Sequence, residues 1–238
     1  MFSELSPMGT AIENKKRRPY MKSLFRLDSP MMQMLSKVAD LMIANVLFWL
    51  CCLPVVTAGA SLAALHKVTQ SIVLEEDGGV VKPFFRAFRD NFKQATLGWL
   101  VVLVLLAGLG ADLLLSISYL TGNALLACKW ICAVVAVIVL AISEYYFHLI
   151  VRYENTMRQH LMNSAILAVV KLPRTIAMMV LTLLPLLIAL VSMNAFLSTL
   201  IFWVIVGFAF ISYSQACLMR PVFHQLEKAE GPNVQLMD

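Results

Sequence analysis

Long apolar segments alternate with short polar ones along most of this chain, at a length typical of membrane-crossing helices. The strongest of these segments are Ala95–Tyr119, Ala124–Tyr146, Ile176–Val191 and Phe196–Met219. A helix needs about 20 apolar residues to cross about 30 Å of hydrocarbon, and the first two segments exceed that length. The turns between them are short, at Leu120–Asn123 and near Ser192–Asn194. The pattern therefore predicts two antiparallel helical hairpins.

Another apolar segment precedes these hairpins. Asp28–Pro30 is a helix-start signal, with a capping residue followed by proline in the first turn. The helix is expected to run from Pro30 to Pro54. Its residues from Val38 onward are apolar enough to cross the bilayer.

The first helix is followed by a turn motif and a weaker helix. Pro54, Thr57 and Gly59 mark the turn, and the segment Thr57–Glu75 then resumes an apolar stripe with a polar opposite side. Such a helix is costly against lipid, so its polar side is expected to face protein or water.

Composition and charge placement agree with a membrane protein. The chain is 60% hydrophobic and 14% charged, whereas soluble domains have about 25% charged residues. Apart from Lys129, every Lys and Arg lies before Val38, within Lys67–Lys93 or Arg152–Arg174, or after Met219. The positive-inside rule then places both termini and both basic segments in the cytoplasm.

These placements require an even number of membrane crossings between the N-terminus and the segment Lys82–Lys93. The N-terminus and Lys82–Lys93 are both expected inside, so the chain must return between Pro54 and Lys82, and Thr57–Glu75 is the available segment. The sequence thus predicts an all-α polytopic transmembrane bundle of about six membrane helices in three hairpins. A re-entrant first pair, inserted without crossing, gives the same parity. The predicted domains are a disordered basic cytoplasmic tail at 1–22, a transmembrane domain at 23–220 and a short cytoplasmic tail at 221–238.

Two amphipathic segments lead into later spans and are predicted to lie at the cytoplasmic interface. Leu161–Val170 is one of them, and Lys82–Lys93 is the other. In the latter, basic residues surround a predicted aromatic face made of Phe84, Phe85, Phe88 and Phe92. An amphipathic segment before a hairpin thus occurs more than once, which indicates either an internal duplication of the sequence or a general way in which helices enter a membrane.

Four stretches carry a family resemblance: LDSP at 27–30, ADL at 39–41, LCCLPVVTAGASLAAL at 50–65 and FFRAFRDNFKQAT at 84–96. In this order they resemble the YesL family of bacterial integral membrane proteins, over residues 24–220. The resemblance implies a bacterial plasma-membrane location and a link with carbohydrate uptake systems of the ABC type, with permease or sensor components as partners. The family falls in a domain class of unknown function and has no established catalytic residues, so none are carried over.

Polar residues inside the spans are the candidate functional residues, because burying them in lipid is costly. Four helices are expected to offer polar groups at one depth in the cytoplasmic half. The members of this predicted polar layer are Asp40, Asn45, His66, Lys67, Glu144, His148 and Gln215. The layer is interpreted either as interhelical hydrogen bonding around a wet vestibule or as a cavity for a ligand or a partner loop. A proton relay through Glu144 and His148 is a third possibility.

Asp112 and Lys129 form a candidate charge pair. They lie at similar distances on either side of Thr121, so an antiparallel hairpin places them at the same depth. The pair is interpreted as structural or as a charged gate near the outer face. Cys128 and Cys132 share a helix face, and all five cysteines read as small packing residues with no zinc or disulfide framework.

The sequence favours non-enzymatic functions. It contains no Gly-x-Ser-x-Gly motif, no His-Glu-x-x-His motif, no intramembrane aspartate pair and no phosphate-cradling loop, so we expect no enzyme, no cofactor and no metal. Nucleic-acid binding is also not expected. Three hypotheses remain: an accessory subunit of a carbohydrate ABC transporter, a channel or secondary transporter, and a scaffold without a ligand.

Overall fold

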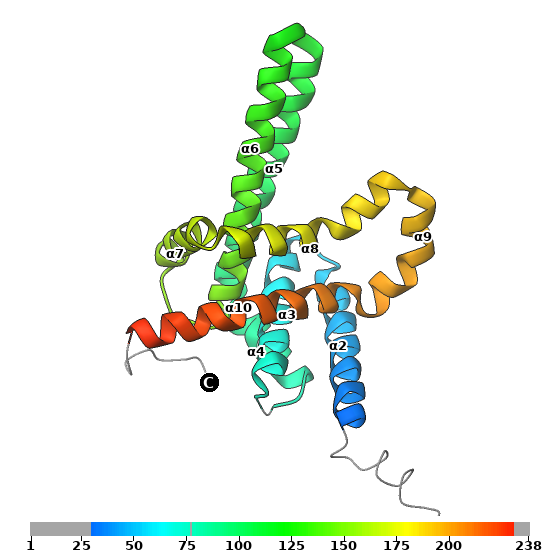
Figure 1. Ribbon diagram of the computed structural model, residues 1–238, viewed down its shortest axis with the longest axis vertical. Helices are drawn as coiled ribbons and strands as arrows, with labels where there is room; N and C mark the ends of the chain where they lie inside the picture. Colours follow the sequence, from blue (N-terminus) through cyan, green and yellow to red (C-terminus); the bar gives the residue numbers. More distant parts are fainter. Residues whose placement is uncertain (1–29, 77, 231–238) are drawn as a thin grey trace, which may run out of the picture. The chain divides into compact units, whose positions relative to one another are not determined.

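The computed structural model describes residues 30–76 and 78–230 (Figure 1). It divides into two units, residues 1–39 and residues 40–238. Helix α2 (Pro30–Cys52) begins in the first unit and continues in the second. The tail predicted at 1–22 lies outside the described residues. The tail predicted at 221–238 is described as far as residue 230, and this part belongs to helix α10.

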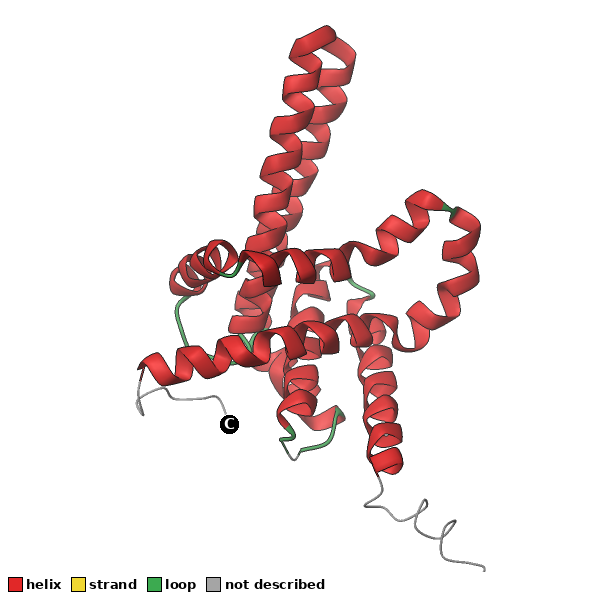
Figure 2. Cartoon of the chain, viewed as in Figure 1, coloured by secondary structure: helices red, strands yellow, loops and turns green. Residues whose placement is uncertain are grey.

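The described residues form helices and no β-strand, which confirms the predicted all-α class (Figure 2). One short 3-10 helix and one π-helix, named η1 and η2, interrupt the series of α-helices. After α2 the order is η1 (Val55–Thr57), α3 (Ala58–Leu74), α4 (Val81–Asp90), α5 (Phe92–Tyr119), α6 (Gly122–Leu149), α7 (Met157–Val170), α8 (Leu172–Val191), α9 (Met193–Phe202), η2 (Trp203–Gly207) and α10 (Phe208–Glu230).

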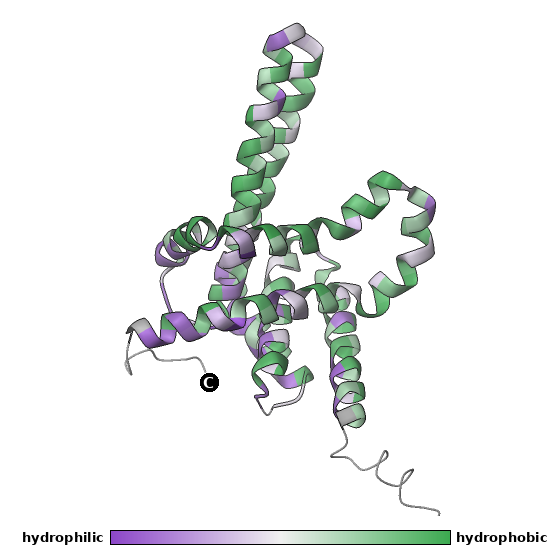
Figure 3. Ribbon diagram, in the orientation of Figure 1, coloured by the Kyte–Doolittle hydropathy of each residue, from purple (hydrophilic) through white to green (hydrophobic). Residues whose placement is uncertain are grey.

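Five helices in the described part of the chain are long and apolar enough to cross a membrane. Their apolar character appears as green ribbon, most continuously along α5 and α6 (Figure 3). The five are Met31–Cys52, Phe92–Tyr119, Gly122–Leu149, Leu172–Val191 and Met193–Lys228. By length and composition they define a multi-pass membrane protein. Helix α3 is not among them, and the arrangement of six crossings in three hairpins stays a prediction.

The helices α5 and α6 form the first predicted hairpin and pack against each other (Figure 1). They are joined at the predicted turn: α5 ends at Tyr119, Leu120 is extended and α6 begins at Gly122. Gly122 has a φ of +61°, a left-handed conformation that glycine adopts without a steric cost.

Helix α3 lies among other helices of the same unit, in contact with α4, α5, α6 and α10. Its first turns carry Gly59, Ala60, Ala63 and Ala64, all buried, and small residues let helix backbones approach closely. A Cβ atom at Gly59 would overlap the Cβ atom of Trp99 and the backbone of α5. The helix is therefore surrounded by protein, which explains how a segment with many polar residues is accommodated.

Helix α4 confirms a helix in the basic segment, but its phenylalanines do not share one face. Phe84 is fully buried in a core with Leu65, and Phe88 packs against the same core. Phe85 is 49% exposed, because consecutive residues of a helix are about 100° apart. The prediction that all four phenylalanines line one face was therefore wrong: Phe85 is exposed, and Phe92, which is 37% exposed, lies beyond α4 at the start of α5.

Helix α7 contains the predicted segment Leu161–Val170 and begins four residues earlier. Thr156 caps its first turn, and Gln159 completes a capping box by accepting a hydrogen bond from the Thr156 backbone N–H. Pro185 lies inside α8, in the span that follows.

Candidate functional site

A buried polar layer joins α3, α6 and α10. The spacing of its residues, three or four positions apart on each helix, puts each set on one face. All of its members are at most 9% exposed: His66, Thr69 and Gln70 on α3, Glu144 and His148 on α6, and Ser212 and Gln215 on α10. Four of the seven residues predicted for the layer are thus brought together: His66, Glu144, His148 and Gln215.

Two histidines from different helices meet at one end of the layer, with their rings tilted by 54° to each other. The ring centroids of His66 and His148 are 4.0 Å apart. The Ser212 hydroxyl lies 2.8 Å from His66 Nδ1 and 2.8 Å from the Thr69 hydroxyl. Thr69 in turn donates to the backbone carbonyl of Leu65 at 3.0 Å. These contacts form one chain of hydrogen bonds from the α3 backbone to the imidazole.

Gln70 sets the tautomer of His148. Its side-chain amide donates to the His148 carbonyl at 3.1 Å and lies 3.3 Å from His148 Nδ1. Because an amide N–H can only donate, Nδ1 is the acceptor and the neutral ring carries its proton on Nε2. Nε2 is buried without a hydrogen-bond partner among the described residues. The ring therefore offers one unused donor inside the layer.

Glu144 occupies the other end of the layer. The Gln215 amide donates to Glu144 Oε2 at 2.8 Å and to the Thr182 hydroxyl of α8 at 2.7 Å. None of the ion pairs found in the described part of the chain includes Glu144. The carboxyl group is thus held by neutral hydrogen-bonding groups from two other helices.

The other three residues of the predicted layer lie apart from it. Lys67 is half-buried, and it follows His66, so its side chain leaves α3 about 100° around the helix. Asp40 is also half-buried, and no hydrogen bond between described residues joins it to the layer. Asn45 is fully buried but serves another element.

Asn45 holds the π-helix η2. Its Nδ2 atom donates to the carbonyls of Trp203 at 3.2 Å and Val204 at 2.6 Å, and its Oδ1 atom accepts from the N–H of Ala209 at 2.9 Å. A π-helix departs from the regular pattern of α-helical hydrogen bonds. The asparagine amide supplies partners at both ends of this irregular turn.

The turn motif is fixed by Thr57 and Gly59. The Thr57 hydroxyl lies 2.7 Å from the Cys51 carbonyl and 2.9 Å from the Pro54 carbonyl, so it bonds the end of α2. Gly59 permits the close contact of α3 with α5. Pro54 precedes η1 and has an extended backbone.

The predicted charge pair is not formed: among the described residues, Asp112 and Lys129 make no ion pair. Asp112 instead accepts hydrogen bonds from the thiols of Cys132 at 3.3 Å and Cys128 at 3.7 Å. Equal depth does not fix the direction around a helix, and Lys129 follows Cys128 by about 100°. The face of α6 that meets Asp112 is therefore the cysteine face.

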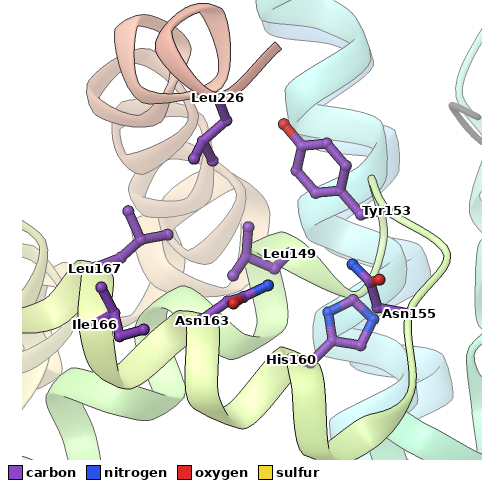
Figure 4. A pocket seen from close by; sticks show the side chains of 8 residues that line it. All are labelled: Leu149, Tyr153, Asn155, His160, Asn163, Ile166, Leu167 and Leu226. Carbon is purple, nitrogen blue, oxygen red and sulfur yellow. The ribbon is translucent and has the colours of Figure 1, made fainter. Parts of the chain in front are cut away.

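Sequence reasoning missed a cavity between α6, α7 and α10. It has a volume of about 150 Å³. Figure 4 shows Leu167 and Leu226 at one side and Tyr153, Asn155 and His160 at the other. His160 is buried, its Nδ1 atom has no hydrogen-bond partner among the described residues, and burial lowers its pKa. No motif singled out these residues, most of which lie on α7 and on the loop that precedes it.

A second, more open hollow of about 410 Å³ adjoins the first one and shares Tyr153 and Asn155 with it. Its lining is rich in amide and acidic side chains. The residues are Asp90, Asn91, Gln94, Ile150, Tyr153, Glu154, Asn155, Thr156 and Gln159.

Arg152 connects helix ends beside these hollows. Its Nη2 atom lies 2.6 Å from Glu227 Oε1, its Nη1 atom lies 3.9 Å from Glu76 Oε1, and its guanidinium stacks 4.8 Å from the Phe223 ring centroid. The side chain is 11% exposed, so this ion pair is better shielded than a surface pair. Arg152 thus ties the end of α6 to α10 and to the residues after α3.

The fold and the buried layer define a polytopic helical membrane protein. A family model described as "Protein of unknown function, DUF624" matches residues 41–113. The match includes the stretches at 50–65 and 84–96 that carry the YesL resemblance, and it confirms the recognition of the family. Over these residues the chain is similar to this family of unknown function. No curated protein and no solved structure was found to match the chain.

Proposed function

We propose that the protein is an accessory membrane subunit of a bacterial carbohydrate uptake system of the ABC type. In this role it contacts a permease or sensor component and does not itself move the sugar or catalyse a reaction. The family resemblance supports the carbohydrate system. The structure supports the accessory role because the polar layer is packed.

The observation that carries the proposal is that the layer is packed. Its side chains bond to one another across α3, α6 and α10 and are almost completely buried. Gln215 also bonds the exposed Thr182 of α8. A translocation path would need a polar cavity at membrane depth. The two cavities described above are lined by other residues, none of which belongs to the layer. A filled layer fixes helices against each other, as an interaction subunit requires.

The proposed topology has six crossings, with both termini in the cytoplasm and the protein in the bacterial plasma membrane. Helix α3 serves as the second crossing because its polar residues face other helices. Helices α4 and α7 lie at the cytoplasmic interface. Cysteine labelling in whole cells tests this: on a cysteine-free background, Val55→Cys and Asn123→Cys should react with an impermeant maleimide, and Glu154→Cys only after permeabilisation. Protection of Val55→Cys would favour the re-entrant alternative.

Arg86 and Arg89 of α4 are the residues proposed to contact a partner. Both side chains are exposed, and both guanidinium groups lie within 3.9 Å of the Asp90 carboxylate. Exposed arginines on a cytoplasmic helix can pair with acidic groups of another subunit. Lys129 provides a matched control, since it is an exposed basic residue on the predicted outer side.

Affinity purification from native membranes in mild detergent tests the proposal. The full-length protein should recover a permease, an ATPase or a sensor of a carbohydrate transporter. The double variant Arg86→Glu/Arg89→Glu should lose this recovery, and Lys129→Glu should retain it. If the folded wild-type protein recovers no transporter component, the accessory role is wrong.

A channel or secondary transporter is the second candidate. Two observations favour it: the unused donor of His148, and the carboxyl of Glu144, which makes no ion pair among the described residues. The two residues lie four positions apart on α6. Purified protein in liposomes should then give solute flux above that of empty vesicles, and Glu144→Gln should abolish the flux. An absence of flux for sugars and ions with folded protein excludes this function.

A further inference from the structure

The hairpin of α5 and α6 brings together three residues of metal-ligating type, Asp112, Cys128 and Cys132, and the hydroxyl of Ser116. Asp112 and Ser116 lie four residues apart on α5, and Cys128 and Cys132 lie four residues apart on α6. Each pair therefore occupies one helix face, and the two faces meet. Asp112 Oδ2 is 3.3 Å from Cys132 Sγ and 3.7 Å from Cys128 Sγ, and Ser116 Oγ is 2.9 Å from Cys128 Sγ.

The spacing of these atoms matches a tetrahedral zinc site. With Zn–S bonds of about 2.3 Å and Zn–O bonds of about 2.0 Å, neighbouring sulfur and oxygen ligands lie about 3.5 Å apart. Two sulfur ligands lie about 3.8 Å apart by the same geometry. The ligand atoms of Asp112, Cys128 and Cys132 all lie within 4.8 Å of one another. Small side-chain rotations would complete the coordination.

The location of Asp112 gives a physical reason for a cation. It lies in an apolar span, where an acidic residue needs a partner, and in the described structure it is held only by two thiols, which are weak hydrogen-bond donors. Two thiolates and one carboxylate carry three negative charges, of which a divalent ion neutralises two. The soft sulfur ligands favour Zn²⁺ over Mg²⁺ or Ca²⁺.

We propose that Asp112, Cys128 and Cys132 bind one Zn²⁺ ion, with the Ser116 hydroxyl or a water molecule as the fourth ligand. The ion clamps α5 to α6 about two to three turns from the Gly122 turn. Binding releases the protons of both thiols, so the affinity rises with pH. The site is separate from the polar layer and does not depend on the proposed accessory role.

The test uses the full-length protein in detergent, reduced, freed of metal by a chelator, and titrated with Co²⁺ and then Zn²⁺. Co²⁺ should bind at one equivalent with a near-ultraviolet thiolate-to-cobalt charge-transfer band, which Zn²⁺ should remove. Asp112→Asn and Cys132→Ser should each weaken binding by at least about 100-fold, since even outer-shell changes cost 10–100-fold. Cys217→Ser removes an exposed cysteine of α10 and should change nothing.

A second measurement needs no variant. Zn²⁺ should slow the alkylation of Cys128 and Cys132 by maleimide at least about tenfold, read by peptide mass spectrometry, and leave Cys217 unaffected. The proposal is overturned if the wild-type protein gives no charge-transfer band, or if Zn²⁺ leaves the alkylation of both cysteines unchanged. A disulfide between Cys128 and Cys132 in protein alkylated directly in the membrane would also overturn it.

Discussion

Replacing Asn45 by leucine removes the side chain that bonds the π-helix η2 to α2. Leucine has a similar size, so the change removes polar contacts with little change in volume. The lost contacts are donated bonds to the Trp203 and Val204 carbonyls and an accepted bond from the Ala209 N–H. Asn45 is fully buried, so water cannot replace the lost partners.

The expected loss follows from these three hydrogen bonds. At about 1 kcal/mol each, they contribute about 3 kcal/mol to the free energy of unfolding. Measured side-chain bonds between membrane helices average about 0.6 kcal/mol, which gives a lower value of about 2 kcal/mol. For a chain of this length, a loss of 2–3 kcal/mol lowers the melting temperature by roughly 4–12 °C.

Thermal unfolding in detergent, followed by circular dichroism, measures this loss. Asn194→Leu is the matched control, because Asn194 is exposed and its side chain makes no hydrogen bond to another described residue; its backbone carbonyl accepts one from Ser198. The control should change the melting temperature by less than about 2 °C. If Asn45→Leu is no less stable than the control, the three bonds do not hold η2 and the reasoning fails.

Three further predictions concern packing, polar pairing and pH. Gly59→Leu should lower the free energy of unfolding by about 1–3 kcal/mol, because the new side chain would overlap α5. Gly108→Leu, where the added side chain enters open space, should leave stability unchanged. Equal melting temperatures for the two variants would contradict this. Gln215→Leu should lower the free energy of unfolding by about 1–3 kcal/mol, because Glu144 loses its amide donor. The double variant Gln215→Leu/Glu144→Met should recover part of this loss. An absence of recovery would argue against the pairing of Gln215 with Glu144. Burial lowers the pKa of His160, so the folded state binds its proton less readily, and stability should fall as the pH drops below about 6.5. Melting curves of His160→Gln should show a weaker fall over that range, and an unchanged fall would exclude His160 as its source.

Hydropathy predicted the long helices because a helix that crosses the hydrocarbon of a membrane consists mostly of apolar residues. The boundaries of α5 and α6 differ from the predicted segments Ala95–Tyr119 and Ala124–Tyr146 by three residues or fewer. Helix α3 has no comparable apolar signal, since its environment is protein. Its existence was predicted from the charge distribution together with a helical stripe.

The partners of polar residues were harder to predict, because depth along a helix says nothing about direction around it. Asp112 and Lys129 have matching depths, but Asp112 faces Cys128 and Cys132. His66 and Lys67 are neighbours in sequence, and only His66 enters the layer. A direction can be assigned only when the packing of at least two helices is known.

Some uncharged polar residues were missed for a different reason. Thr69 joins the layer and Thr182 of α8 bonds Gln215, yet threonine is common on helix surfaces and gives no signal on its own. His160 was missed because it lies outside the spans, where a histidine carries no cost that would draw attention to it.

The layer also explains why a polar helix is retained at the centre of these contacts. Each hydrogen bond between membrane helices contributes little free energy, so the layer adds less to stability than apolar packing does. Its bonds are directional, however: Ser212 reaches α3 only if Gln215, three residues along α10, reaches Glu144 of α6. A shift of α10 by one residue would rotate both side chains by about 100° and break both contacts. The polar residues of α3, α6 and α10 therefore specify one register among helices whose apolar faces would accept several.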